Sequence, residues 1–242
     1  MKADFSFKQF SLAQDRCAMK VGTDGVLLGA WAEGGKRVLD IGSGTGLIAL
    51  MMAQRFPEAT VVGIDIDGAA CSQARENVSS SPFSCRVDIV HTSLQDYALA
   101  VGESDKDGVG QQFDSIVCNP PFFIYSLRSP DPQRALARHA DSLPFSDLFQ
   151  GVKRLLSADG VFSAVIPSEY LEQFSVNAYL SGFYLSRKYD VKTTPKKPVR
   201  RHLVAFRRKL PHTLDRQSVC LQETDGSRSG WYSRLTSDFL LR

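Results

Sequence analysis

Apolar runs rich in β-branched residues alternate with segments of helical periodicity from residue 36 onward. The runs expected to form strands are 36–41, 60–66, 86–92, 113–118, 161–167, 184–192 and 201–209. Helical spacing marks 47–56, 68–78, 169–182 and the segment 145–160, which ends in the turn Asp159-Gly160. Asp67 is the expected N-cap of the helix at 68–78, since its carboxylate can accept from free first-turn amides. The alternation predicts an α/β fold in which helices cover both faces of a mostly parallel, seven-stranded sheet.

The length of 242 residues suits one large α/β domain. We divide residues 1–242 into an N-terminal extension on the ligand side (1–35), a core (36–210) and a C-terminal extension (211–242). The hydrophobic share of 43% predicts a sizeable core and excludes a disordered chain. No apolar run approaches the roughly 20 residues of a membrane span, and the start lacks a secretory signal, so we expect a cytoplasmic protein.

Cysteine content and net charge exclude few classes of function. The five cysteines are far apart and form neither a CxxC motif nor a cluster with histidine, so we expect core residues and no metal site. The net charge of +3 does not by itself indicate a partner.

Three glycines, Gly42, Gly44 and Gly46, lie at alternate positions where the first strand meets a helix. Glycine permits a sharp turn and lets a ligand approach the backbone closely. The spacing GxGxG fits neither the dinucleotide motif GxGxxG nor the phosphate-binding GxxxxGK[ST]. Asp40 precedes the turn, and Asp65 ends the second strand, where a carboxylate can bind ribose hydroxyls. The pattern favours a nucleoside ligand, and a purely structural turn is the alternative.

The sequence Asn119-Pro120-Pro121-Phe122 follows the fourth predicted strand, at the edge where open α/β sheets bind ligands. The side-chain oxygen of Asn119 and the carbonyl of Pro120 are two acceptors, and consecutive prolines hold them stiffly. Together they can accept both hydrogens of a planar NH₂ group and direct its lone pair at an electrophile. Phe122 offers a face on which a base can stack. A strand end with a proline turn is the structural alternative.

The segments VLDIGSGTG and VVGIDID resemble the first two motifs of the class I S-adenosylmethionine-dependent methyltransferases. The resemblance implies a Rossmann-like fold with S-adenosylmethionine as cofactor. It implies that Asp40 and the backbone of Gly42 to Gly46 hold the amino-acid end of the cofactor, and that Asp65 binds its ribose. The position that contacts the adenine in that family matches Ser93 or Asp96 here. Asn119 belongs to the signature [DNS]PP[YFW] of enzymes that methylate planar NH₂ groups.

A closer resemblance covers most of residues 5–170. The segments MKVGTDGVLLGAW, NPPFF and ARHADSLPFSDL are similar to those of the bacterial tRNA(Val) adenine-37 N6-methyltransferases. The resemblance implies N6 methylation of adenine 37 in the anticodon loop of a tRNA. We expect the enzyme to be a monomer without a metal. It also implies that Lys20, Thr23 and Asp24 line the cofactor and target pocket. A helix cap at Thr23-Asp24 is an equally simple reading.

Basic residues concentrate between Arg187 and Arg216, where Asp190 and Asp215 are the opposing acids. The basic residues considered there are Lys188, Lys192, Lys196, Lys197, Arg200, Arg201, Arg207, Arg208 and Lys209. The alternatives are a solvated face and an RNA-binding surface, and the prolines and aromatics in this stretch favour RNA. The RNA contacts we expect are Arg128, Arg134, Arg138, Lys196, Lys197, Arg200 and Arg201.

Other functions fit parts of the pattern. Guanine-N2 methylation of ribosomal RNA uses a similar NPPF turn, and cytosine N4 also carries a planar NH₂ group. Methylation of a glutamine amide would leave the basic stretch without a role. A cofactor-binding or RNA-binding module without activity would not need the NPPF turn.

Overall fold

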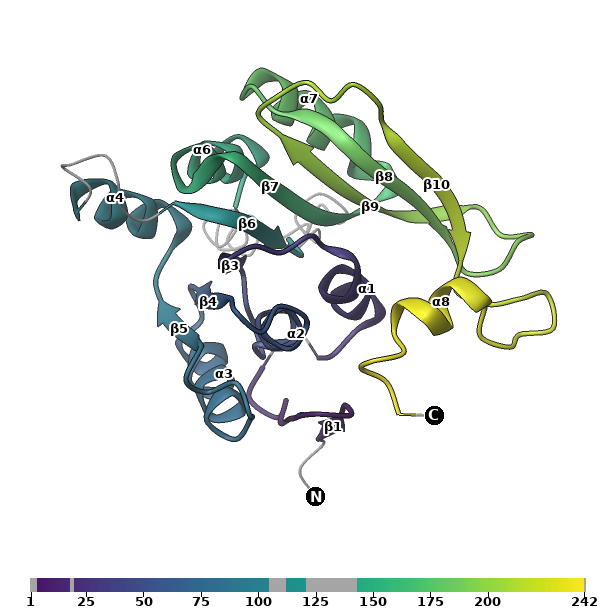
Figure 1. The fold of residues 1–242 in the computed structure, drawn as a ribbon, viewed down its shortest axis with the longest axis horizontal. Coiled ribbons are helices and arrows are strands. Elements are labelled where there is room, and N and C mark those ends of the chain that lie inside the picture. Colours follow the sequence, from purple (N-terminus) through teal and green to yellow (C-terminus); the bar gives the residue numbers. More distant parts are fainter. Residues whose placement is uncertain (1–3, 18–19, 105–111, 121–142, 242) are drawn as a thin grey trace, which may run out of the picture.

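An eight-stranded sheet forms the centre of the protein (Figure 1). The computed structural model describes residues 4–17, 20–104, 112–120 and 143–241. The strands of this sheet are β3 (Arg37–Ile41), β4 (Thr60–Asp65), β5 (Val87–His91), β6 (Phe113–Cys118), β7 (Leu156–Pro167), β8 (Tyr184–Lys192), β9 (Val199–Arg207) and β10 (Asp215–Cys220). Their order is β10-β8-β9-β7-β6-β3-β4-β5. Within this sheet, as far as the structure describes it, only the pairs of β9 with β7 and β8 are antiparallel, so the predicted mostly parallel sheet is confirmed.

Helices cover both faces of the sheet, as expected (Figure 1). On one face lie α1 (Thr23–Trp31), α2 (Leu47–Arg55) and α3 (Gly68–Ser79), which share one hydrophobic core. On the other lie α4 (Leu94–Ser104), α6 (Phe145–Leu155) and α7 (Leu171–Leu180), preceded by the short turn η1 (Ser168–Tyr170). Nearly all of α1 and α2 is buried, which explains why their sequences are apolar on every side. Within the described residues, no helix combines the length and the apolar character needed to cross a membrane.

Local signals placed several elements correctly. Asp67 caps α3, because its carboxylate accepts hydrogen bonds from the backbone N–H groups of Ala69 and Ala70. The helical spacing of 145–160 is borne out over α6, where Leu148, Val152 and Leu155 form a buried stripe. The helix nevertheless ends at Leu155, earlier than the segment 145–160 suggested, because Leu156 already pairs with Phe113 of β6. A bulge follows, and regular pairing resumes at Val161.

The sheet has one strand more than the seven predicted. This strand, β10, lies in the C-terminal extension and pairs in parallel with β8 at the edge of the sheet. Four of its six residues are exposed and only Val219 is fully buried, so it carries no apolar run to mark it. The helix α4 was also not predicted from the sequence.

The two terminal extensions meet each other on the face of α1 and α2. The N-terminal hairpin pairs β1 (Phe5–Ser6) with β2 (Ser11–Leu12), and the C-terminal region contains α8 (Gly230–Leu235). Phe7 forms a bridge with Leu240, and the backbone N–H of Lys8 donates to the carbonyl of Phe239. The extensions therefore add to the core instead of standing apart from it.

The cysteines are all free and only partly match the expected core positions. Cys17, Cys71 and Cys118 are buried, whereas Cys85 is exposed and Cys220 is half-buried. The prediction of core cysteines was thus wrong for Cys85. Within the described residues, no group of three or more metal-ligating side chains occurs.

Candidate active site

The glycine turn between β3 and α2 requires glycine for two reasons. Gly42, Gly44 and Gly46 have φ of 72°, 55° and 81°, in the left-handed region that side chains disfavour. A Cβ at Gly42 or Gly44 would meet nothing within 4 Å, so both face open space. At Gly46 a Cβ would approach the Cβ of Ala74 at 3.4 Å, because the turn packs against α3 there. The turn therefore presents the backbone of Gly42 and Gly44 to open space.

Asp40 lies completely buried beneath this turn. Its Oδ2 accepts hydrogen bonds from Ser43 Oγ at 2.9 Å and from the backbone N–H of Ala49 at 3.1 Å. Its Oδ1 has no partner in the described structure. Burial raises the pKa of Asp40 to about 7, although the bonds from Ser43 and Ala49 oppose the rise. An unpaired buried carboxylate oxygen is a fitting site for a cationic ligand group.

Asp65, at the end of β4, is held by the backbone on both sides. Its Oδ2 accepts from the N–H of Gly44 at 2.8 Å, and its Oδ1 accepts from the N–H of Asp67 at 2.9 Å. Each carboxylate oxygen has a further lone pair, so the half-buried group can still accept from two hydroxyls. The next side chain, Ile66, is apolar and 55% exposed. Carboxylate and apolar surface thus lie side by side, as a nucleoside would require.

Ser93 and Asp96, the two positions between which the sequence did not choose, are bonded to each other. Ser93 Oγ accepts from the backbone N–H of Asp96 at 3.0 Å and donates to Asp96 Oδ2 at 2.7 Å. They lie at the beginning of α4, and the N–H of Thr92 donates to the carbonyl of Asp65. Both residues therefore belong to the same edge of the sheet as Asp65.

Strand register brings Asn119 next to the glycine turn. Cys118, the last residue of β6, pairs with Ile41, the last residue of β3, and adjacent strands lie about 4.8 Å apart. Asn119 and Gly42 follow these two residues directly, so the half-buried Asn119 begins beside the turn. Pro120 is described and buried. Pro121, Phe122, Arg128, Arg134 and Arg138 lie outside the described residues.

The first turn of α1 differs from the predicted helix cap. The N-cap residue is Gly22, and no side chain provides a cap hydrogen bond. Lys20 and Thr23 are exposed. Asp24 forms an ion pair with Arg201 of β9. Burial raises the pKa of Asp24, and the positive charge of Arg201 opposes the rise.

Sequence reasoning missed Asn77, a buried residue of α3. Its Nδ2 donates to the carbonyls of Ala13 and Thr45, both at 2.9 Å, and its Oδ1 accepts from the N–H of Ala13 at 2.9 Å. Asn77 therefore ties the N-terminal segment to the glycine turn. The one signal in the sequence is a polar residue on the apolar side of a helix, which is too common to indicate this contact.

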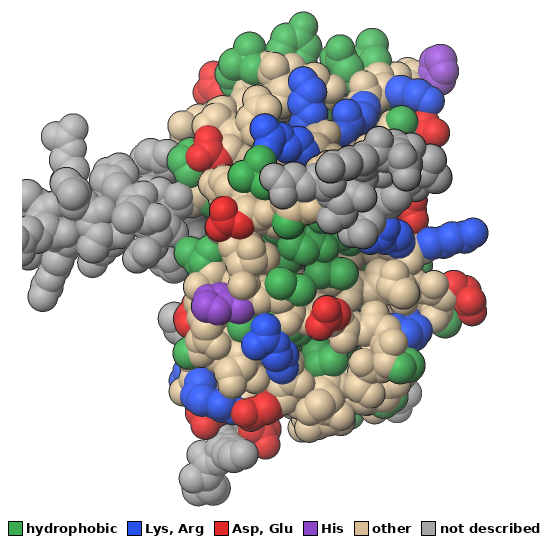
Figure 2. All heavy atoms as spheres, turned by 90° about the vertical axis from the view of Figure 1, so that its left-hand side faces the viewer, with side chains coloured by type: hydrophobic (Ala, Val, Ile, Leu, Met, Phe, Trp, Pro, Cys, Tyr) green, Lys and Arg blue, Asp and Glu red, His purple; other side chains and the backbone are tan. Residues whose placement is uncertain are grey.

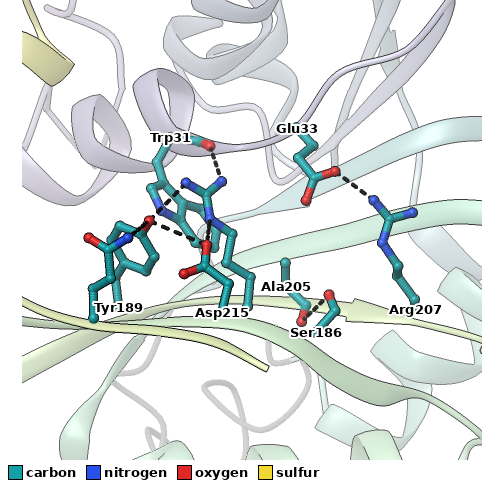
Figure 3. Close-up of polar contacts among 9 residues, drawn as sticks. Trp31, Glu33, Ser186, Tyr189, Ala205, Arg207 and Asp215 are labelled. Atoms are coloured by element: carbon teal, nitrogen blue, oxygen red, sulfur yellow. Dashed lines mark hydrogen bonds and ion pairs between the residues drawn. The ribbon is translucent and has the colours of Figure 1, made fainter. Parts of the chain in front are cut away.

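Most of the basic stretch is neutralised in the fold. Lys188 pairs with Asp190 at 2.7 Å, Arg207 with Glu33 at 2.5 Å, and Lys209 with Asp159 at 2.6 Å. Figure 3 shows the reach of Arg207 to Glu33, from β9 to the loop after α1. Arg208 instead donates to backbone carbonyls. Among the basic residues considered in this stretch, four side chains have no polar partner within the described part of the chain: Lys192, Lys196, Lys197 and Arg200.

These four residues define a basic hairpin, the β8–β9 connection with its flanking strand ends. Lys196, Lys197 and Arg200 are exposed, and Lys192 is half-buried. At its base, His202 Nδ1 lies 2.5 Å from Asp190 Oδ1, and its Nε2 lies 3.0 Å from Ser168 Oγ. Burial lowers the pKa of His202, and Asp190 opposes the change. The hairpin thus contains the cations of the basic stretch that remain unpaired in the described structure.

Figure 2 shows the side of the molecule toward β5, α3 and α4. Apolar side chains gather in its middle, and acidic side chains are spread around them. Ile66 and Leu99 are among the exposed apolar residues of these elements and their connections.

Comparison with known proteins assigns the family. The family model described as methyltransferase small domain matches residues 21–169. The tRNA1(Val) (adenine(37)-N6)-methyltransferase of Bacteroides fragilis is 44% identical over 98% of both chains. The enzyme of the same name from Bacteroides thetaiotaomicron is 48% identical over 84% of this chain and 82% of its own. This chain belongs to their family. The resemblance read from its motifs is thereby confirmed.

Solved structures of low identity support the fold alone. A predicted O-methyltransferase from Agrobacterium tumefaciens superposes with a TM-score of 0.69 at 17% identity, covering 89% of this chain and 96% of its own. A TehB-like SAM-dependent methyltransferase from Corynebacterium glutamicum gives a TM-score of 0.50 at 19% identity, covering 78% and 89%. The class I methyltransferase fold predicted from the sequence is therefore confirmed.

Proposed function

We propose that this protein transfers a methyl group from S-adenosylmethionine to the N6 amino group of adenine 37 in tRNA(Val). The observation that carries the proposal is the register of β3 and β6, which sets Asn119 beside the glycine turn. A planar amine held at Asn119 would then lie next to a cofactor held at the turn. The names of relatives that match over nearly the whole chain specify the base and the tRNA.

The residues present fit S-adenosylmethionine. The unpartnered Oδ1 of Asp40 would accept from the ammonium group of the cofactor, and the bare turn at Gly42 and Gly44 would hold its amino-acid end. Asp65 would accept from the ribose hydroxyls, and Ile66 would pack against the adenine. Ser93 and Asp96 lie at the same edge for contacts to that base. When bound, the cofactor supplies an electrophilic methyl group on a sulfonium.

Asn119 and Pro120 would orient the amine of the substrate. The Asn119 side-chain oxygen and the Pro120 carbonyl accept the two N–H groups, so the nitrogen lone pair is directed away from the ring plane. The nitrogen needs no strong base beforehand, because it loses its proton to solvent or a nearby acceptor only after its new bond has begun to form. We expect Phe122, in the same motif, to stack on the base.

The basic hairpin is our candidate for the RNA backbone. Lys196, Lys197 and Arg200 are exposed and free of partners within the described chain, so they can neutralise phosphates without first breaking an ion pair. An anticodon loop suits this enzyme, because its bases are partly unstacked and can be turned outward. We further expect a monomer that works in the cytoplasm, where tRNA is found.

Transfer of a labelled methyl group tests the function. The full-length protein is incubated with labelled S-adenosylmethionine and total tRNA from cells that lack the modification. We expect label that nuclease releases as N6-methyladenosine and that maps to position 37 of tRNA(Val). Release of the label as N2-methylguanosine would contradict the proposal and indicate a guanine substrate. Label that protease removes and nuclease does not would also contradict it and indicate a glutamine amide.

A further inference from the structure

Arg200 and Arg201 are neighbours in sequence with different surroundings. Arg200 is exposed and has no polar partner within the described residues. Arg201 pairs in register with Pro167, at the carboxyl end of β7, and its Nη1 donates to Asp24 Oδ1. The side chains of Arg201 and Asp24 are only 26% and 40% exposed. Because the charge of Arg201 is already compensated by Asp24, it would attract a phosphate only weakly.

The turn of α1 that contains Asp24 lies against the beginning of α2. A Cβ on Gly25 would come within 2.9 Å of Leu47 Cδ2, so the two helices touch at this point. Leu47 is the first residue of α2, and its N-cap is Gly46, the last glycine of the turn. A shift of the first turn of α1 would therefore reach the glycine turn through direct packing.

Polar contacts hold the N-terminal segment and the first turn of α1 on two sides. On the side of α3, Asn77 forms hydrogen bonds with Ala13 of the N-terminal segment and with Thr45 of the glycine turn. On the side of β9, the contact is the ion pair between Asp24 and Arg201. Because no side chain caps α1, this ion pair is the only polar side-chain interaction of its first turn within the described residues.

We propose that Arg201 is a positioning residue for the cofactor site, which acts through Asp24 on the first turn of α1 and not through contact with RNA. The inference rests on the proposed cofactor site at the glycine turn. It assigns adjacent arginines to separate tasks, since Arg200 faces solvent beside the free lysines of the basic hairpin. It also replaces our expectation from the sequence that both residues bind RNA.

The test compares Arg201→Gln with Arg200→Gln in the full-length protein. We expect Arg201→Gln to weaken S-adenosylmethionine binding, measured by titration calorimetry, roughly tenfold and to leave tRNA affinity within about twofold. Arg200→Gln should instead leave cofactor binding unchanged and weaken tRNA binding a few-fold. Arg201→Lys keeps a charge that can reach Asp24, and it should recover most of the lost cofactor affinity.

A double-mutant cycle shows whether Arg201 acts through Asp24. Asp24→Asn should weaken cofactor binding about as much as Arg201→Gln, and the double variant should be no weaker than the worse single variant. Additive losses would overturn the inference, and so would an Arg201→Gln protein with wild-type cofactor affinity. Circular dichroism of each variant checks folding, with Asp24→Asn and Arg201→Lys as the milder changes. A wild-type protein without affinity for S-adenosylmethionine would instead refute the proposed function.

Discussion

The glycine turn and the basic stretch contrast in where their polar partners come from. In the turn, Ser43 bonds Asp40 three residues away, and Gly44 bonds Asp65 21 residues away. In the basic stretch, Arg201 finds Asp24 177 residues away, and Arg207 finds Glu33 174 residues away. When the contacts of a motif lie close by in the sequence, its structure can be predicted from its own residues. A run of charges cannot, because its partners arrive from distant parts of the chain.

The largest effect should come from Asn119, which follows the strand beside the turn. We expect Asn119→Ala to lower kcat by roughly 100-fold or more, because the amine loses one of its two orienting acceptors. Cofactor affinity should change little. Asn119→Ser keeps an acceptor that the motif tolerates, so it should retain more activity than alanine. Single-turnover rates and calorimetry measure both, and wild-type turnover in Asn119→Ala would show that the orienting role is wrong.

The next largest effect should come from a side chain added at the glycine turn. A side chain at Gly44 would enter the open space that we assign to the cofactor, so Gly44→Ala should weaken binding at least roughly tenfold. Gly182→Ala is the matched control, because Gly182 also has positive φ and also faces open space, far along the chain between α7 and β8.

Both alanine variants should lose about 1–2 kcal/mol of stability from backbone strain, which thermal unfolding measures. Only Gly44→Ala should lose cofactor affinity. Equal cofactor affinities in the two variants would show that the open space at the turn is not the binding site.

The ionisation of Asp40 should make cofactor binding depend on pH. Burial raises its pKa to about 7 in the free protein, so the carboxylate that an ammonium group requires is lost as the pH falls through 7. Affinity should drop by up to about tenfold per pH unit below that value. Calorimetry from pH 5.5 to 7.5 measures the slope, and a flat profile for the wild type would contradict this role.

The same ionisation has a consequence for stability. The folded pKa lies above the unfolded value of 3.8, so burial of the charged form destabilises the free protein increasingly as the pH rises from about 4 to 7. Asp40→Asn should abolish this trend and also the pH dependence of cofactor binding. Urea unfolding of both proteins across this range provides the comparison.

The smallest effect should come from single lysines of the basic hairpin. Lys196→Gln and Lys197→Gln should each weaken tRNA binding a few-fold and reduce the slope of log K against log salt by about 1. Lys209→Gln is the control, because Lys209 belongs to the same basic stretch but forms an ion pair with Asp159. If all three variants changed tRNA affinity equally, the distinction between free and paired cations would not predict which residues bind RNA.

How far the fold could be predicted depended on local signals. The expected β6 and β8 have the observed bounds, and Asp67 caps α3 as predicted, because apolar runs and capping residues act within a few positions. The edge strand β10 escaped notice, since it is exposed and is stabilised by its register with β8. The end of α6 was misplaced because pairing of Leu156 with β6 overrides helical periodicity.

The sequence by itself determined the family and the mostly parallel α/β sheet, because short motifs and apolar runs encode their own backbone geometry. The roles that we assign to the residues of the glycine and NPPF turns remain predictions. Only the tertiary structure decided that Asn77 links the N-terminal segment to the glycine turn, that Arg201 pairs with Asp24 and that the unpaired cations of the basic stretch lie in one hairpin. Ion pairs and buried amides depend on which groups the fold brings within about 3 Å of each other, and that distance is set by the packing of segments far apart in the chain.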